Sequence, residues 1–221
     1  MERYARNFNS ISREEQEKIM NLKVAIVGLG GLGGYVLENL VRLGVKSFNL
    51  IDRDVFEESN LNRQILSTEK TLGLKKAEEA YRRAKEIDSS VQAKVFSAEL
   101  DDNREDMLEG VDIVVDCLDS IAGRLKLETL CHKLNLTLVH GAIRGYYGQV
   151  TVSSPQNRCL RMIYKDLRKD NESLGNLPMT CMVTASFQVN LLLKAILYNE
   201  IVRDLILIDV KNMEIERLKI Q

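Results

Sequence analysis

Gly28-Leu29-Gly30-Gly31-Leu32-Gly33-Gly34 is the stretch that decides the fold, because of what lies on either side of it. The apolar, β-branched run 22–27 precedes it, and apolar residues at helical spacing follow over 32–43. A strand, a glycine turn and a helix in this order are typical of nucleotide-binding sheets, where glycines let the backbone approach a phosphate. The alternative is a glycine turn that only packs a helix closely against a strand. We expect the nucleotide to lie against Gly28, Gly30, Gly31 and Gly33.

The rest of the first 140 residues repeats this alternation of strand and helix. Further strands are expected over 47–51, 91–98, 111–115 and 137–140, and further helices over 12–20, 71–87, 101–108 and 120–134. Such alternation implies parallel strands with crossover helices. The sequence therefore predicts a Rossmann-like α/β fold, with a mostly parallel sheet and helices on both of its faces.

The pattern changes in the C-terminal third of the chain. Residues 149–153 alternate weakly, and 155–178 are polar without clear periodicity. An apolar helical run covers 182–197, and the alternating runs 205–210 and 213–220 predict a terminal hairpin. We therefore expect added antiparallel strands within one domain over 1–221, made of a nucleotide-binding half (1–140) and a second half (141–221).

Polar residues follow the second expected strand, at the edge where open α/β sheets bind ligands. Asp52 lies about 20 residues beyond the glycines, where a carboxylate can accept hydrogen bonds from ribose hydroxyls, and Asp54 follows it. In the string 59–64, Arg63 offers a charged fork for phosphate oxygens, and Asn60 can bind a phosphate or a ribose. The alternative for this string is a polar surface turn with asparagine caps.

Two later segments add charged residues at the same predicted edge. Lys76 stands in the first turns of the next helix, where it can reach a phosphate or simply face solvent. Asp119 follows the strand 111–115 and can hold a magnesium ion, although an Asp here can also cap the helix that starts near Ser120.

Composition excludes several classes of protein and ligand. Lys plus Arg total 31 and Asp plus Glu total 32, so the net charge of −1 gives no case for nucleic acid or a membrane surface. The sequence is not expected to contain an apolar run near the ~20 residues of a membrane span. Cys159 and Cys181 stand singly rather than in CxxC pairs, so a structural zinc site is not expected. The cysteine usage predicts a reducing compartment, the cytoplasm.

Taken together, these motifs resemble the ThiF/MoeB/HesA family of adenylyltransferases, relatives of the ubiquitin-activating enzymes. GLGGLGG, the Asp-x-Asp pair, SNLNRQ, GLKK and DCLDS occur in family order and at family spacing over nearly the whole chain. The resemblance implies that ATP and magnesium are used to adenylate a carboxylate. That carboxylate would be the C-terminal Gly-Gly carboxylate of a small ubiquitin-like sulfur carrier protein.

The resemblance also implies roles for individual residues. Asp52 would hold the ATP ribose, Asp119 would bind magnesium, and the phosphate contacts would come from Asn60, Arg63 and Lys76. Further nucleotide contacts would come from Asp54, Gln64 and Ser120.

Three further segments match parts of the family pattern. Arg6 matches an N-terminal arginine that reaches the nucleotide of the other subunit in a homodimer, although a solvated N-terminal arm is the plainer interpretation. The strand around Gln149 resembles the strand near the carrier tail. Residues 158–178 resemble the crossover loop that covers that tail.

The chain departs from the family pattern in four ways. The usual two zinc-binding CxxC pairs are reduced to Cys159 and Cys181, and Ser120 replaces the asparagine that normally follows the metal-binding aspartate. The stretch from Leu160 to Thr180 contains no cysteine, which argues against a thioester in that loop. A rhodanese-like domain is not expected, so another protein would deliver the sulfur.

Alternative functions remain open at this point. A family member could activate another carboxylate or a tRNA base, an oxidoreductase could bind NAD through the same glycines, and an inactive scaffold could bind a carrier without reaction. The carrier itself could serve thiamine, molybdopterin, tungstopterin or cysteine-type sulfur pathways.

Overall fold

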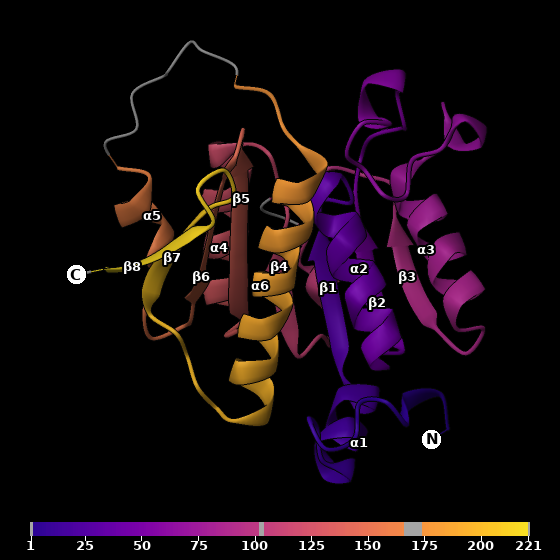
Figure 1. Cartoon of the computed structure of the whole chain (residues 1–221), viewed down its shortest axis with the longest axis horizontal. Helices are drawn as coiled ribbons and strands as arrows, with labels where there is room; N and C mark the ends of the chain where they lie inside the picture. Colours follow the sequence, from indigo (N-terminus) through magenta and orange to yellow (C-terminus); the bar gives the residue numbers. More distant parts are fainter. Residues whose placement is uncertain (1, 102–103, 166–173, 221) are drawn as a thin grey trace.

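The computed structural model describes residues 2–101, 104–165 and 174–220. Within them, eight strands form one sheet in the order β3-β2-β1-β4-β5-β6-β7-β8 (Figure 1). Neighbours from β3 to β5 are parallel, and those from β5 to β8 are antiparallel. The strands are β1 Lys23–Val27, β2 Ser47–Ile51, β3 Gln92–Phe96, β4 Ile113–Asp116, β5 Thr137–Arg144, β6 Tyr147–Ser153, β7 Asp204–Asp209 and β8 Glu214–Lys219. The predicted mostly parallel sheet with antiparallel additions is confirmed.

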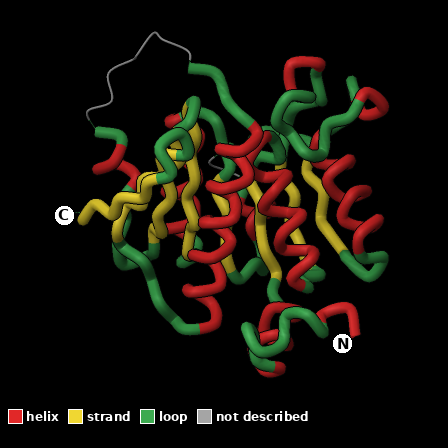
Figure 2. Tube along the Cα trace, viewed as in Figure 1, coloured by secondary structure: helices red, strands yellow, loops and turns green. Residues whose placement is uncertain are grey.

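Helices cover both faces of this sheet, as predicted (Figures 1 and 2). The α-helices are α1 Arg13–Asn21, α2 Gly31–Leu43, α3 Lys76–Ile87, α4 Ile121–Lys133, α5 Leu160–Ile163 and α6 Pro178–Leu197. Short 3-10 turns cover Glu2–Tyr4, Glu58–Asn60, Glu69–Thr71 and Glu105–Leu108. Helices α2, α3 and α6 share one apolar core with the sheet, and α4 and α5 share the other.

Strand β1 shows how the sequence builds these two cores. Successive side chains of a strand point to opposite faces of the sheet. Val24 and Ile26 accordingly join the core under α2 and α6, while Ala25 and Val27 join the core under α4. A strand buried on both faces is apolar at its buried positions, which is why Val24, Ala25, Ile26 and Val27 form a continuous apolar run after the partly exposed Lys23.

The glycine turn brings α2 into direct contact with the end of β1. Gly28 has φ +91°, a conformation that L side chains rarely adopt. A Cβ on Gly33 would lie 1.9 Å from the carbonyl oxygen of Gly28, so no other residue fits there without moving the backbone. Gly33 therefore serves close packing of the helix on the turn.

Several elements differ from their predicted bounds. The helix expected over 71–87 starts at Lys76, because the side chain of Thr71 bonds back to Thr68 in a separate 3-10 turn. Strand β5 extends to Arg144 and joins β6 through a two-residue turn. Helix α5 lies in a stretch without predicted structure, and α6 starts at Pro178 instead of 182. Of the helix expected over 101–108, the described part is the 3-10 turn Glu105–Leu108.

Helix α6 corrects the expectation that no apolar run approaches the length of a membrane span. It has 20 residues, and an 18-residue window of mean hydropathy 1.4 meets that criterion by length and composition. In the fold, α6 packs on β5, β6 and α2, and 44% of the window is buried. Its apolar character is accounted for by this position in the core.

The N-terminal segment is anchored to the fold, contrary to the solvated arm considered for it. Tyr4 is 4% exposed, and its hydroxyl lies 3.3 Å from a carboxylate oxygen of Asp88. Arg3 forms an ion pair with the same carboxylate at 2.5 Å. Asp88 directly follows α3, so this segment lies at the end of the sheet opposite the glycine turn (Figure 1).

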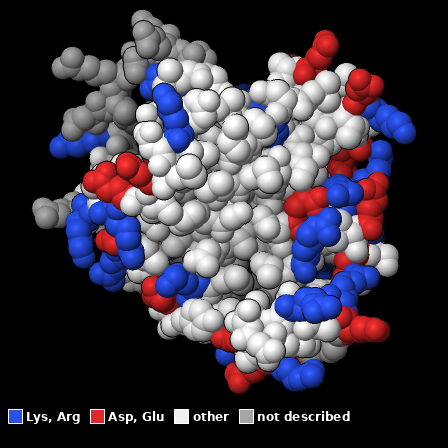
Figure 3. Space-filling model, in the orientation of Figure 1, with Lys and Arg blue, Asp and Glu red and all other residues white. Residues whose placement is uncertain are grey.

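The surface over α2 and α6 carries few charged side chains, while acidic and basic residues surround it (Figure 3). Exposed apolar residues on these elements and the neighbouring loop include Ile65, Met179 and Met182, at 40%, 43% and 49% exposure. Loop residues 60–66 pack beside α2 here, since a Cβ on Gly34 would meet Ile65 and Leu66.

Candidate active site

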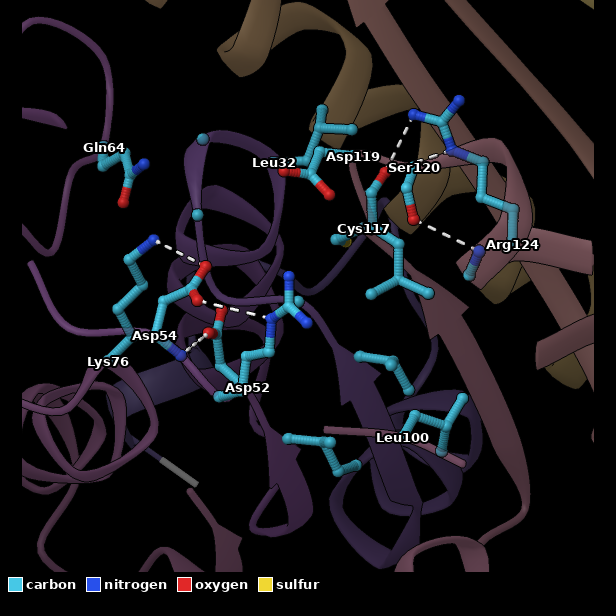
Figure 4. Close-up of a pocket in the computed structure, with 18 of the residues that line it drawn as sticks. Leu32, Asp52, Asp54, Gln64, Lys76, Leu100, Cys117, Asp119, Ser120 and Arg124 are labelled. Atoms are coloured by element: carbon cyan, nitrogen blue, oxygen red, sulfur yellow. Dashed lines mark hydrogen bonds and ion pairs between the residues drawn. The ribbon is translucent and has the colours of Figure 1, made fainter. Parts of the chain in front are cut away.

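A pocket opens at the carboxyl ends of β1, β2 and β4, where α2 and α4 leave on opposite faces of the sheet. Such a switch point is where open α/β sheets bind ligands. Figure 4 shows Asp52, Asp54 and Lys76 on one side of this pocket, and Asp119, Ser120 and Arg124 on the other. The predicted site residues that line it are Gly28, Gly30, Gly31, Asp52, Asp54, Arg63, Gln64, Lys76, Asp119 and Ser120.

Asp52 ties the glycine turn to the end of β2. One carboxylate oxygen accepts from the backbone N–H of Leu29 at 2.6 Å, and the other from that of Asp54 at 2.8 Å. Burial raises the pKa of this carboxyl above its usual value, against the effect of these two hydrogen bonds. Each oxygen keeps lone-pair capacity that a ligand hydroxyl could use.

Lys76 places a nearly buried positive charge in the pocket wall. Its side chain is 9% exposed, and Nζ lies 3.6 Å from a carboxylate oxygen of Asp54. The backbone N–H of Lys76 also donates to the carbonyl of Asp54 at 3.0 Å. The start of α3 is thereby fixed to the end of β2, and the ammonium group is held where it can meet an anionic ligand.

Arg63 and Gln64 reach the pocket from the loop after β2. The Nη1 of Arg63 donates to the carbonyl of Ser59 at 2.9 Å and to the side chain of Asn62 at 2.8 Å. These bonds leave the other guanidinium nitrogens for a ligand in the pocket that Arg63 lines. Gln64 is 5% exposed and lies against Gly30.

The turn between β4 and α4 separates two roles that the sequence left open for Asp119. Ser120 caps the helix by accepting from the backbone N–H of Gly123 at 3.2 Å. Asp119 lines the pocket and is exposed. Since Ser120 supplies the cap, the Asp119 carboxylate stands in a position to bind a cation.

Three predicted residues do not line this pocket. Gly33 lies behind the turn that it packs against. Asn60 is 7% exposed and holds its own loop, because its Oδ1 accepts from the backbone of Glu57 at 3.1 Å. Arg6 is exposed in the anchored N-terminal segment, at the other end of the sheet.

The structure adds four polar residues that sequence reasoning missed: Arg53, Glu99, Arg124 and Asn176. Arg53 pairs with Glu99 at 2.9 Å, and its position between Asp52 and Asp54 was the available signal. Arg124 stands four residues after the helix cap, one turn into α4. Asn176 reaches the pocket through its backbone pairing with the β5–β6 turn, which no local pattern indicates.

The four cysteines are buried and unbonded to one another. Among the described residues, no group of three or more His, Cys, Asp or Glu could hold a metal ion. The thiol of Cys159 donates to the carbonyl of Val152 at 3.8 Å, and Cys181 packs against Gly31. Burial raises the pKa of each of these two thiols to about 11, so both are protonated near neutral pH.

Solved structures share this architecture at low sequence identity. The chain superimposes on the crystal structure of Escherichia coli MccB with ATP at a TM-score of 0.82 and 20% identity, covering 99% of this chain and 71% of that one. It also matches PaaA at a TM-score of 0.80 and 19% identity, over 100% of this chain and 82% of that one. These similarities show the fold.

Curated relatives are more similar in sequence. The SAMP-activating enzyme E1 of Haloferax volcanii is 32% identical over 75% of this chain and 63% of its own length. The molybdopterin-synthase adenylyltransferase of Haemophilus influenzae is 33% identical over 72% of this chain and 65% of its own length. The chain thus spans just under two thirds of these relatives. Residues 4–221 match the ThiF family over nearly the whole sequence, and the protein described here belongs to that family.

Proposed function

We propose that this chain is an ATP-dependent adenylyltransferase that activates the C-terminal carboxylate of a ubiquitin-like protein. The observation that carries this proposal is the meeting of Arg63, Lys76 and the N-terminus of α2 around one pocket, with Asp119 on the opposite wall. A site that only carries a dinucleotide has no evident use for both cations. A site that stabilises charge on a phosphate during reaction does.

The residues present fit a magnesium nucleotide. Gly28, Gly30 and Gly31 leave the turn without side chains, so backbone N–H groups and the α2 terminus are open to phosphate oxygens. Asp119 supplies the hard oxygen ligand that magnesium prefers, alongside the phosphates themselves. When bound there, magnesium would offset the negative charge of the phosphates. Asp52 would accept from the ribose hydroxyls.

The proposed reaction is an in-line displacement at phosphorus. A carboxylate oxygen of the partner forms a bond to the α-phosphorus of ATP, and the bond to the bridging oxygen of pyrophosphate breaks. A C-terminal carboxylate is already ionised near pH 7, so no general base is required. Arg63 and Lys76 would hold the phosphate oxygens as negative charge grows on them, and catalysis would rest on this positioning.

For the partner, we propose a small sulfur carrier protein that ends in Gly-Gly. The relatives support this choice, since their names describe a SAMP-activating enzyme, a molybdopterin-synthase adenylyltransferase, and the adenylyltransferase and sulfurtransferase MOCS3 of Drosophila persimilis. Molybdopterin and thiamine biosynthesis are the pathways that we consider first. The cytoplasm is the compartment that we propose.

We also propose a homodimer as the working form. Arg6 lies at the end of the sheet away from its own pocket, so it could serve a nucleotide only in a second copy. The weakly charged surface over α2 and α6, with Met179 and Met182 exposed on it, suits contact with another subunit (Figure 3). Light scattering after size-exclusion chromatography tests this point, and a monomer at working concentration would contradict it.

Carrier-dependent exchange of pyrophosphate into ATP tests the proposed reaction. Loss of one well-placed electrostatic donor costs about 3 kcal/mol, so we expect Arg63→Ala to lower the exchange rate roughly a hundredfold. Arg42→Ala is the matched control, because Arg42 is exposed at the far end of α2 and should leave exchange unchanged. Equal rates for Arg63→Ala and the wild type would remove Arg63 from the site.

Titration with ATP and NAD distinguishes the proposed adenylyltransferase from its main alternative, an NAD-binding oxidoreductase. Tight binding of NAD with no binding of ATP would replace the proposal by an oxidoreductase. Mass spectrometry of the product, with and without a Gly-Gly protein, distinguishes carrier activation from adenylation of a different carboxylate.

A further inference from the structure

A buried polar cluster lies beside the pocket and has no role in the proposed reaction. It joins five side chains from five different parts of the chain: Asp116, Arg124, His140, Gln149 and Tyr164. Asp116 and His140 are fully buried, and Arg124 is 8% exposed. Buried polar groups are costly unless each has a partner, so the connections within this cluster are informative.

The hydrogen bonds of His140 assign its tautomer. Its Nδ1 lies 2.7 Å from a carboxylate oxygen of Asp116, which can only accept, so Nδ1 carries the proton. Its Nε2 lies 3.2 Å from the amide nitrogen of Gln149, which can only donate, so Nε2 is an acceptor, and the hydroxyl of Tyr164 donates to it at 2.9 Å. Burial raises the pKa of Tyr164 to about 12, so this hydroxyl keeps its proton at any physiological pH.

The Tyr164 hydroxyl makes all the hydrogen bonds that it can make. Besides donating to His140, it accepts from Nε2 of Gln149 at 2.9 Å and from Nη1 of Arg124 at 3.0 Å. One donated and two accepted hydrogen bonds fill the capacity of a hydroxyl group. The guanidinium of Arg124 also lies over the Tyr164 ring, 5.6 Å from its centroid.

Arg124, held in this way, in turn holds part of the pocket wall in place. Its Nε and Nη2 donate to the carbonyl of Leu118 at 3.1 and 2.8 Å. The backbone N–H of Leu118 donates to Asp116 at 3.0 Å. Both backbone polar groups of Leu118 are therefore held by the cluster, and the next residue is Asp119.

Helix α4 also holds the chain that carries Tyr164. One oxygen of the buried Glu128 accepts from the backbone N–H groups of Cys159 and Leu160, both at 2.9 Å. Arg124 and Glu128 are four residues apart, so they lie on the same face of α4. Helix α5 is thus attached to α4 at its start by Glu128 and beyond its end by Tyr164.

We propose that Tyr164 is a positioning residue for the nucleotide pocket: its hydroxyl fixes the guanidinium of Arg124, and Arg124 fixes the turn that bears Asp119. This inference rests on the proposed function, because the ligand of Asp119 is taken to be magnesium bound to ATP. It adds to Asn176 a second residue from the segment after β6 that shapes the pocket.

Calorimetric titration of the whole chain with ATP and magnesium tests this role without a carrier protein. Tyr164→Phe keeps the ring and removes the hydroxyl, and we expect about fivefold to tenfold weaker binding of ATP, within the range for loss of one ordinary hydrogen bond. The magnesium concentration for half-maximal ATP binding should rise in parallel. Tyr81→Phe on α3 is the matched control, since the Tyr81 hydroxyl has no role in the cluster.

Two further variants separate positioning from general destabilisation. Leu40→Ala removes buried apolar atoms near the far end of α2 and should lower the melting temperature while ATP affinity stays at the wild-type value. Arg124→Lys should weaken ATP binding by itself. The double variant with Tyr164→Phe should then bind ATP within twofold of Arg124→Lys, because Tyr164 acts through Arg124.

Each result has a distinct meaning. Wild-type ATP affinity and magnesium dependence in Tyr164→Phe would overturn the positioning role, and so would additive losses in the double variant. A wild-type protein that binds no ATP would refute the proposed function, and the inference with it.

Discussion

The parallel and antiparallel parts of the sheet contribute to the pocket in different ways. In the parallel part, site residues such as Asp52 and Asp119 directly follow β2 and β4, and backbone topology brings them together. In the antiparallel part, long-range side-chain bonds hold the structure around the pocket. Gln188, for example, donates to the carbonyl of Asp116 from 72 residues away.

This difference predicts where each part is vulnerable. The parallel part should lose stability when its backbone segments are forced apart, since its geometry depends on the close approach of α2 to β1. The antiparallel part should fail when a single buried side chain loses its partners, because an unpaired buried group costs the full desolvation penalty. The four changes below test this comparison, from the largest expected effect to the smallest.

Gly33→Ala should be the most damaging change. The new Cβ would lie 1.9 Å from the carbonyl oxygen of Gly28, a backbone atom that cannot rotate away. We expect destabilisation above about 4 kcal/mol, the range of the rare severe substitutions, and loss of ATP binding. Urea denaturation followed by circular dichroism measures the stability of any soluble fraction.

Gly34→Ala is the control one residue further along α2. Its Cβ would meet only side-chain atoms, of Ile65 at 3.0 Å and Leu66 at 3.2 Å, which can shift. Alanine also favours the helix by about 1 kcal/mol over glycine. A Gly34→Ala variant as unstable as Gly33→Ala would contradict the backbone explanation.

Glu128→Gln tests a single side chain of α4 that holds the start of the C-terminal third, at Ser153, Cys159 and Leu160. One Glu128 oxygen accepts from the Ser153 hydroxyl and from the N–H groups of Cys159 and Leu160, and the amide loses the charge that strengthens these bonds. We expect a loss of about 2–3 kcal/mol in the free energy of unfolding. The exposed Glu86→Gln should change it by less than about 0.5 kcal/mol, as for surface ion pairs. Similar losses for both variants would refute a special role for Glu128.

Gly141→Ala tests the packing of α6 on β5. The added Cβ would lie 2.3 Å from Cδ of Gln188, which must then give up its bonds to the carbonyls of Asp116 and Val139. We expect destabilisation of about 2 kcal/mol, from one unsatisfied buried amide. In a Gln188→Ala background the clash disappears, so Gly141→Ala should then cost much less. Additive losses in denaturant titrations would rule out this coupling.

Asp88→Asn should have the smallest effect, at the anchor of the N-terminal segment. Burial acts to raise the pKa of Asp88, but hydrogen bonds from Ser90 and the ion pair with Arg3 outweigh it and hold the pKa well below its usual value. A carboxyl with a lowered folded pKa adds stability above its unfolded value of 3.8, and this stability is lost as pH falls through the folded pKa.

At pH 7 we therefore expect Asp88→Asn to cost about 1 kcal/mol, typical of a partly exposed ion pair with added hydrogen bonds. The difference from the wild type should narrow as the pH is lowered below 4. Melting curves of both proteins at pH 7 and pH 3 measure this, and a constant or widening difference would exclude the assigned pKa shift.

Sequence patterns predicted the parallel part of the fold closely and the antiparallel part loosely. The continuous apolar run before Gly28 marked β1, because a strand buried on both faces is apolar at its buried positions. The terminal hairpin β7–β8 was also predicted, from its alternation. Helix α5 was missed, since its four residues are too few to show a period, and it is held by Glu128 from a distant helix.

The sequence by itself determined the strand–glycine–helix unit and the polar residues at the ends of β2 and β4, because each of these depends on local spacing. Only the tertiary structure decided that Asn60 holds its own loop, that Gly33 serves packing, and that Arg124 and Asn176 belong to the pocket wall. It alone joined Tyr164 to Asp116. The physical reason is that a hydrogen bond between distant residues depends on where the folded backbone places both partners, and no periodicity along the chain encodes that distance.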